Sequence, residues 1–118
     1  MQHSSNVGQS ETKMLKIDIE AVRQYQRLCG CPETEEIPLL FLARYWREFD
    51  IFAPFVKAPI LLVETEVVKK EPIPFTDSLQ ATLTWSVAQD LKRFKRFRFE
   101  LSLPGQNKIR QTFIQKVM

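Results

Sequence analysis

Histidine and cysteine are scarce in this chain. Among 118 residues there is one histidine, His3, and there are two cysteines, Cys29 and Cys31. The C-x-C spacing closes too small a loop for an unstrained disulfide, and a metal site would need further Cys or His ligands that the chain beyond residue 3 lacks. We therefore expect two reduced thiols, no metal site and no bound cofactor.

Long apolar runs are also missing. No stretch approaches the roughly 18–20 apolar residues that span a bilayer, and the first residues, "MQHSSNVGQSETK", lack the apolar segment of a secretory signal. We expect a cytoplasmic protein with no membrane contact, made of a disordered leader over residues 1–10 and a single domain over residues 11–118. The hydrophobic fraction of 44% is typical of a globular domain.

Two helices are predicted in the first half of the chain. Residues 17–30 carry apolar side chains every three to four residues, with Asp18 as the N-cap and Gly30 as the stop signal. Residues 37–55, "IPLLFLARYWREFDIFAPF", are apolar over so wide an arc that this helix should be buried. Pro54 and Pro59 are expected to end it.

After Pro59 the apolar period changes from 3.6 to 2, which indicates strands. The pattern predicts four strands in an antiparallel meander, and a short strand around Met14–Ile17 could precede them. A sheet wrapped around the buried helix would bury the apolar faces of both, so we expect an α+β fold. The four predicted strands cover residues 60–70, 79–87, 94–103 and 108–117.

A basic and aromatic stretch covers Leu91–Glu100, "LKRFKRFRFE". In a strand, alternation sends Phe97 and Phe99 to the core and separates them from the cations, whereas single-strand nucleic-acid binders present both kinds of side chain on one surface. Phe94 is out of phase, which predicts a turn or bulge around Asp90–Phe94. The net charge of only +3 indicates by itself no more than some preference for acidic partners. The candidate residues for a phosphate-bearing ligand such as coenzyme A, or for an acidic carrier protein, are Lys92, Arg93, Lys95, Arg96 and Arg98.

The order of these segments resembles the MaoC-like hot-dog family of acyl-thioester hydratases and dehydratases. The resemblance covers about residues 17–117. Three stretches carry it: "IDIEAVRQYQRLCGCPE" is similar to the family's opening helix, "IPLLFLARYWREFDIF" to its buried central helix, and "LLVETEVVKKEPIPFTDSLQATLTW" to its strand, proline-containing connector, Asp turn and next strand. The resemblance implies a hot-dog fold, in which an antiparallel sheet wraps around a central helix.

The chain departs from the family at its catalytic pair. Active members carry an Asp followed closely by a His, and this chain has no His beyond residue 3. We expect no catalytic residue of that type, and we interpret Glu48, Asp50 and Asp77 as structural or solvent-facing.

The resemblance points instead to the non-catalytic N-terminal half of double hot-dog hydratases, or to the equivalent separate subunit of heterodimeric dehydratases. It implies binding of acyl-CoA or acyl-carrier protein, or support of a catalytic partner, as a homodimer or a heterodimer with another hot-dog subunit. The acyl chain would contact residues of the buried helix and the sheet, for which the candidates are Phe41, Tyr45, Phe52 and Trp85.

Two alternatives remain open at this level. One is an active hot-dog thioesterase or hydratase that uses other catalytic groups, such as a carboxylate. The other is a nucleic-acid or anion-binding module that uses the basic residues 92–98.

Overall fold

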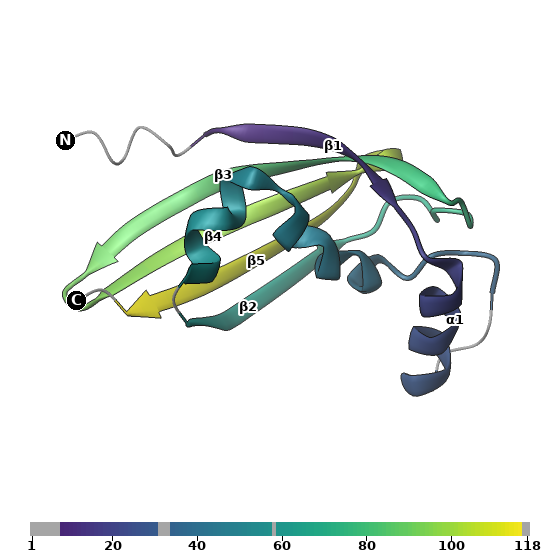
Figure 1. Ribbon diagram of the computed structural model, residues 1–118, viewed down its shortest axis with the longest axis horizontal. Helices are drawn as coiled ribbons and strands as arrows, with labels where there is room; N and C mark the ends of the chain where they lie inside the picture. Colours follow the sequence, from purple (N-terminus) through teal and green to yellow (C-terminus); the bar gives the residue numbers. More distant parts are fainter. Residues whose placement is uncertain (1–7, 31–33, 58, 117–118) are drawn as a thin grey trace.

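A computed structural model describes residues 8–30, 34–57 and 59–116. They form one antiparallel sheet with helices against one of its faces (Figure 1). The elements, in chain order, are β1 (Ser10–Lys16), α1 (Ile19–Leu28), the 3₁₀ helices η2 (Leu39–Glu48) and η3 (Asp50–Lys57), β2 (Ile60–Val68), β3 (Ser78–Leu91), β4 (Phe94–Leu103), the 3₁₀ turn η4 (Pro104–Gln106) and β5 (Asn107–Lys116). This confirms the predicted α+β class.

The strand order is β1-β3-β4-β5-β2. The prediction of a simple four-strand meander was therefore wrong for the strand after Pro59, because β2 pairs with β5 and not with β3. The possible early strand exists as β1 and pairs along β3. Residues 1–7 of the predicted leader lie outside the described residues, whereas Gly8 and Gln9 extend the pairing through backbone hydrogen bonds to Trp85.

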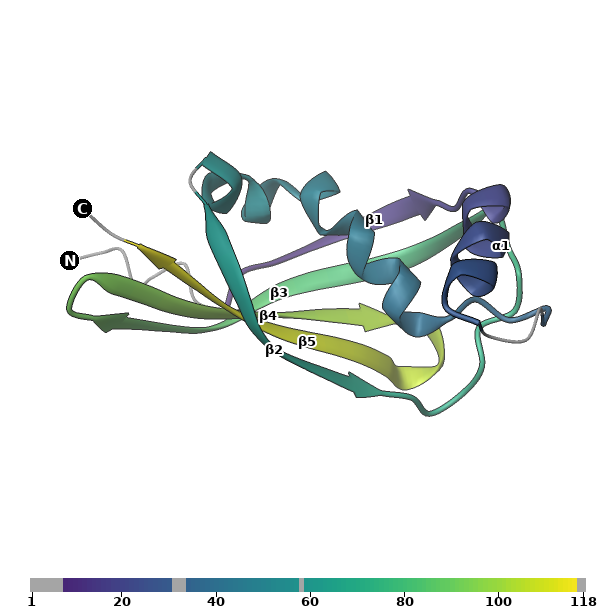
Figure 2. The ribbon, with the colours of Figure 1, turned by 90° about the horizontal axis from the view of Figure 1, so that it is seen from below.

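The helical segments η2 and η3 cross the concave face of the sheet, and α1 lies beyond one end of it (Figure 2). The prediction of a single buried helix was wrong in detail. Phe49, fully buried, adopts an extended backbone (φ −94°, ψ 131°) that separates η2 from η3, and Pro54 lies inside η3 and does not end it. Bonds such as Phe49 N–H to Trp46 O (3.1 Å) follow the i→i+3 pattern of a 3₁₀ helix.

The hairpin between β3 and β4 extends further than its sequence predicts. The turn predicted around Asp90–Phe94 is confirmed, because Lys92 and Arg93 form it. The register also shifts between Trp85 and Val87, which places a bulge at Ser86 that the sequence analysis did not predict. This shift turns Val87, which strict alternation assigns to the core, outward to 41% exposure. The strands continue to the pair Leu91–Phe94, and only two residues form the turn.

The core lies between the helical layer and the inner face of the sheet. Alternation along β4 buries Phe97, Phe99, Leu101 and Leu103, as predicted.

The α1 helix begins as predicted, with Asp18 Oδ1 accepting a hydrogen bond from the Ala21 N–H (3.2 Å). In the described part of the chain no helix is long and apolar enough to cross a membrane.

Candidate functional site

An aromatic cluster occupies the inner face of the sheet beneath η3. Phe55 stacks on Phe97 with 4.1 Å between ring centroids and meets Trp85 edge-on at 5.2 Å. Phe52 packs edge-on against Phe99 at 5.1 Å and Phe113 at 5.7 Å. The cluster forms because η3 places one ring every three residues against strand positions that alternate inward.

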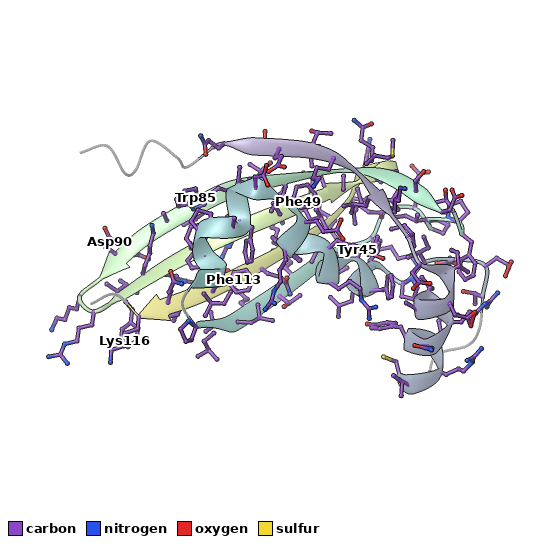
Figure 3. The ribbon with its side chains drawn as sticks, in the orientation of Figure 1. Tyr45, Phe49, Trp85, Asp90, Phe113 and Lys116 are labelled. Carbon is purple, nitrogen blue, oxygen red and sulfur yellow. The ribbon has the colours of Figure 1, made fainter. Side chains whose placement is uncertain are left out.

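The four predicted acyl-contacting residues divide between two places. Phe52 and Trp85 belong to the cluster beneath η3, whereas Phe41 and Tyr45 lie in η2 and pack on each other at 5.9 Å. Tyr25 of α1 joins this second group at 5.6 Å from Phe41. Figure 3 shows Trp85 under η3 and Tyr45 further toward α1. All four are at most 8% exposed, so in this structure they serve as core residues.

Lys95 is the one predicted anion-binding residue that adjoins the aromatic cluster. In the register of β4 it points to the same face as Phe97, which is the helix-covered face. Its Nζ lies 5.1 Å from the Trp85 ring centroid and 5.4 Å from that of Phe55, within the range of a cation–π interaction. Lys95, a half-buried residue, therefore borders the cluster at its hairpin end with its ammonium group.

The other cations of the hairpin point elsewhere. Arg96 and Arg98 lie on the outer face of the sheet, where both approach Glu64 of β2 (3.9 and 3.5 Å). Arg98 also donates from Nε to Thr112 Oγ1 (3.0 Å). Lys92 and Arg93 form the exposed turn, with Lys92 in a left-handed conformation (φ 46°). The structure thus separates the five cations into an inner residue, an outer pair and a turn pair.

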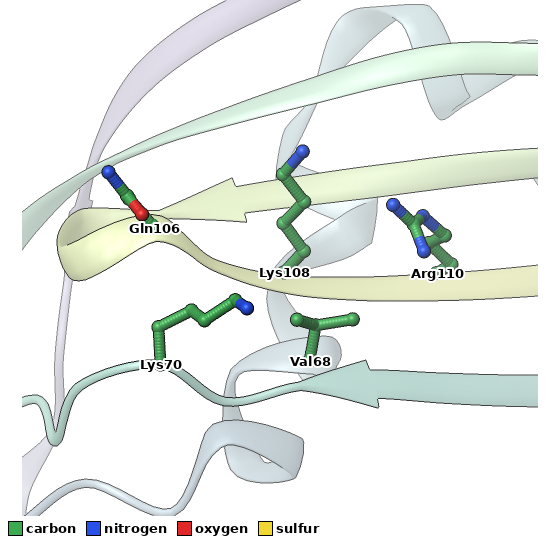
Figure 4. Close-up of a pocket in the computed structure, with 5 residues that line it drawn as sticks. All are labelled: Val68, Lys70, Gln106, Lys108 and Arg110. Carbon is green, nitrogen blue, oxygen red and sulfur yellow. The ribbon is translucent and has the colours of Figure 1, made fainter.

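A second set of cations, which the sequence analysis did not single out, surrounds a pocket of about 340 Å³ on the outer face (Figure 4). Lys108 and Arg110 reach it from β5, two residues apart and therefore on one face. Val68 is directly opposite Lys108 in the register of β2 and β5. The lining residues are Val68, Lys70, Gln106, Lys108 and Arg110.

Carboxylates hold two of these cations. Arg110 Nε donates to Glu100 Oε1 at 2.8 Å, and its Nη1 lies 3.3 Å from Glu66 Oε1. Lys108 Nζ is 3.6 Å from Glu100 Oε2. Burial by itself would raise the pKa of Glu100, but the hydrogen bond from Arg110 and the charge of Lys108 bring that pKa below its usual value. Glu100 is therefore ionised throughout the neutral range.

The outer edge strand, β2, is exposed along most of its length. Only Ile60 and Val68, at its ends, are half-buried. Its exposed apolar side chains include Leu61 (64%) and Leu62 (47%), which point to opposite faces because they are neighbours in the strand. An edge with free backbone groups and apolar side chains on both faces is suited to pairing with a further strand.

The carboxylates considered as alternative catalytic groups are all at the surface. Glu48, Asp50 and Asp77 are exposed. His3, the one histidine of the sequence, lies outside the described residues. In the described part of the chain no group of three or more His, Cys, Asp or Glu side chains is placed to hold a metal ion.

Comparison with solved structures confirms the hot-dog fold. The C-terminally truncated HadBC (3R-hydroxyacyl-ACP dehydratase) complex from Mycobacterium tuberculosis contains a chain with a TM-score of 0.65 and 18% identity, over 93% of this chain and 96% of that one. A MaoC-like dehydratase gives a TM-score of 0.68 at 15% identity, over 97% of this chain and 43% of that one. The fold is thus the one found in MaoC-like hydratases and dehydratases.

Sequence comparison identifies nearer relatives. Protein VraC of Staphylococcus haemolyticus is 33% identical over 120 residues, which is 98% of this chain and 95% of that protein. The sequence profile described as "Uncharacterised conserved protein VraC" matches residues 1–117. This chain, a hot-dog domain with an aromatic inner face and an open edge strand, belongs to the VraC family.

Proposed function

We propose that this chain is a non-catalytic hot-dog domain that binds acyl thioesters, as acyl-CoA or acyl-carrier protein, or supports a catalytic hydratase or dehydratase partner. The proposal includes a cytoplasmic role in fatty acid metabolism. The observation that carries it is the position of Lys95, whose ammonium group borders the rings of Trp85 and Phe55.

Such an arrangement suits a ligand with an apolar chain and an anionic head. The acyl chain would enter among the rings beneath η3, where Phe52 and Trp85 lie, and the phosphates would remain near Lys95, with Lys92 and Arg93 at the adjacent turn. Because these rings already contact one another, an acyl chain needs side-chain rearrangement of η3 residues. Phe41 and Tyr45 would contact only the far end of a long acyl chain.

The pairing part of the proposal rests on β2. A second hot-dog subunit, identical or different, would continue the sheet from this edge and cover Leu61 and Leu62. The similar HadBC protein is itself a complex, which supports a heteromeric partner. A partner would also supply the catalytic His that this chain lacks beyond residue 3.

Calorimetric titration with a medium-chain enoyl-CoA, followed by product analysis of the mixture, tests the binding part. We expect binding without conversion, weakened about tenfold in Lys95→Gln because one charge-assisted contact is lost. Lys16→Gln, which removes an exposed cation from β1, is the matched control and should bind as the wild type does. Absence of binding by the protein and by its complexes would refute the proposal, and conversion to product would favour an active enzyme.

Sedimentation velocity tests the pairing part. Leu61→Lys should convert a dimer, or a complex with a hot-dog partner, to the monomer, because a charge would enter the paired edge. Leu28→Lys replaces a leucine of α1 that is still more exposed (88%, against 64% for Leu61) and should leave the assembly intact. A wild-type monomer that gains no partner would contradict this part alone.

The nucleic-acid alternative has less support from the structure. Its five candidate cations do not share one surface, and Arg96 and Arg98 are already near Glu64. Oligonucleotide binding that weakens with salt and is lost when Arg93, Arg96 and Arg98 are replaced would revive it.

A further inference from the structure

The outer-face pocket described above brings cations together from two segments of the chain that are distant in sequence. Lys108 and Arg110 come from β5, and Lys70 comes from the segment that follows β2. Figure 4 shows the Lys70 side chain extending toward Val68, while Lys108 and Arg110 project from β5. We propose that this pocket is a binding site for the diphosphate group of a small ligand.

The cations keep hydrogen-bond donors available for such a ligand. Arg110 uses Nε and Nη1 for its two carboxylate contacts, and its Nη2 has no acceptor in the described part of the chain. Lys70 Nζ has neither an ion pair nor a hydrogen bond among the residues that the structure describes, and Lys108 makes only the 3.6 Å contact with Glu100. Donors of this kind bind phosphate oxygens strongly, and a guanidinium held by carboxylates is already oriented.

The hydrogen bonds of one buried side chain, Asn107, connect the segments that line the pocket. Asn107, fully buried, accepts hydrogen bonds at Oδ1 from the N–H groups of Lys70 (2.7 Å) and Glu71 (3.2 Å). Its Nδ2 donates to the carbonyl oxygens of Glu71 and Pro104, both at 2.8 Å. One buried amide thus fixes the segment that carries Lys70 to the turn between β4 and β5.

The same turn holds Gln106 in a left-handed conformation (φ 62°), which a residue other than glycine rarely adopts. Such backbone conformations persist only where the surroundings enforce them, and they concentrate at binding sites. The conformation places the Gln106 side chain on the pocket rim, where its amide adds a neutral donor.

Size and charge together select the ligand class. A volume of about 340 Å³ is at the small end of ligand pockets, which suits a compact anion and not an extended nucleic-acid strand. Glu66 and Glu100 offset part of the positive charge, so a singly charged anion gains little. A diphosphate, with several negative charges and many acceptor oxygens, can engage Lys70, Lys108 and Arg110 at the same time.

This site is independent of the proposed acyl-thioester binding. Lys108 and Arg110 face outward from β5, whereas Lys95 and the aromatic rings lie on the helix-covered face. Loss of one activity should therefore leave the other unchanged, and each proposal can fail alone.

The test is a titration of the full chain with pyrophosphate, followed by ¹H–¹⁵N NMR. We expect saturable shifts centred on residues 68–71 and 106–110. Lys70→Gln and Lys108→Gln should each weaken binding about fivefold, the factor expected for one lost surface cation at about 1 kcal/mol. Lys116→Gln on the same strand is the matched control and should bind pyrophosphate as the wild type does.

A parallel titration with ADP identifies the source of the diphosphate. Equal affinity for ADP and pyrophosphate would support a site for the diphosphate group alone, and tighter ADP binding would support a nucleoside diphosphate. Absence of saturable shifts with both probes would overturn the proposal. So would shifts centred on the hairpin at residues 91–96, or equal binding by the wild type and both pocket variants.

Discussion

Replacement of Asn107 is the sharpest test of how this fold is held together. The Asn107 side chain is fully buried and makes four hydrogen bonds with backbone groups, three of them in Lys70 and Glu71 after β2 and one at Pro104 of η4. Asn107→Ala removes the side-chain partner of all four backbone groups. We expect the free energy of unfolding to fall because these backbone groups lose the four hydrogen bonds that hold them to Asn107.

The magnitude follows from the number of bonds. At about 1 kcal/mol for each of the four bonds, Asn107→Ala should destabilise the protein by about 4 kcal/mol. For a chain of this length that corresponds to a fall of about 16 °C in Tm. Asn107→Asp keeps an acceptor for the two N–H groups but sets its second carboxylate oxygen against the carbonyl oxygens of Glu71 and Pro104 at a fully buried position, so it should destabilise the protein at least as much as Asn107→Ala.

Urea unfolding followed by tryptophan fluorescence measures these differences, since Trp46 and Trp85 are both buried. Gln111→Ala is the matched control, because Gln111 is a buried amide on the same strand with a single bond, from Nε2 to Thr65 Oγ1 (3.1 Å). It should cost about 1 kcal/mol for that bond. If Asn107→Ala is no more destabilising than Gln111→Ala, the four hydrogen bonds of Asn107 do not stabilise the protein as we infer.

Substitutions at three further positions test other features. Trp46→Phe removes a buried Nε1 that has no partner in the described part of the chain. Removal of this unsatisfied group should offset the free energy lost with the smaller side-chain volume, so that the free energy of unfolding in urea changes by no more than about 1 kcal/mol. Trp46→Ala should cost about 3–5 kcal/mol. Gly105→Ala should cost about 1–2 kcal/mol in the same assay, because Gly105 has φ 77° and an added Cβ would lie 3.1 Å from Glu71 Cβ; an unchanged midpoint would contradict this. Glu100→Gln should flatten the acid limb of stability. Because the folded-state pKa of Glu100 is lowered, its ionised form stabilises the protein above about pH 4.3, and this contribution is lost as the pH falls through the folded-state value. Parallel acid unfolding curves for the two proteins would refute that role.

Much of the local structure was predictable because local rules decide it. The N-cap at Asp18 and the alternation from Phe97 to Leu103 depend on neighbours within one element, and both predictions are confirmed. The hot-dog fold was predicted from the order of segments that resemble a known family, and the solved structures confirm it. The identities of the acyl-contacting and anion-binding residues stay predictions.

The wrong predictions all depend on contacts between distant segments. Nothing near β2 in the sequence indicates that β5 is its neighbour, because pairing depends on how the chain crosses the sheet. The break at Phe49 arises where a buried ring must fit the core, and the bulge at Ser86, which the sequence analysis did not predict, arises where β3 must fit against β4. Sequence periodicity carries no information on such a fit.

The sequence by itself determined the α+β fold class, through the strand and helix periods of its apolar residues, and the alternation of charges along the strands. It also determined the lack of a His for the catalytic pair of MaoC-like hydratases. Only the tertiary structure decided which charges share a surface. It set Lys95 beside the rings of Trp85 and Phe55, and it brought Lys70 within one pocket with Lys108 and Arg110. The physical reason is that alternation fixes the face of each side chain along one strand, whereas the pairing of strands fixes which side chains become neighbours.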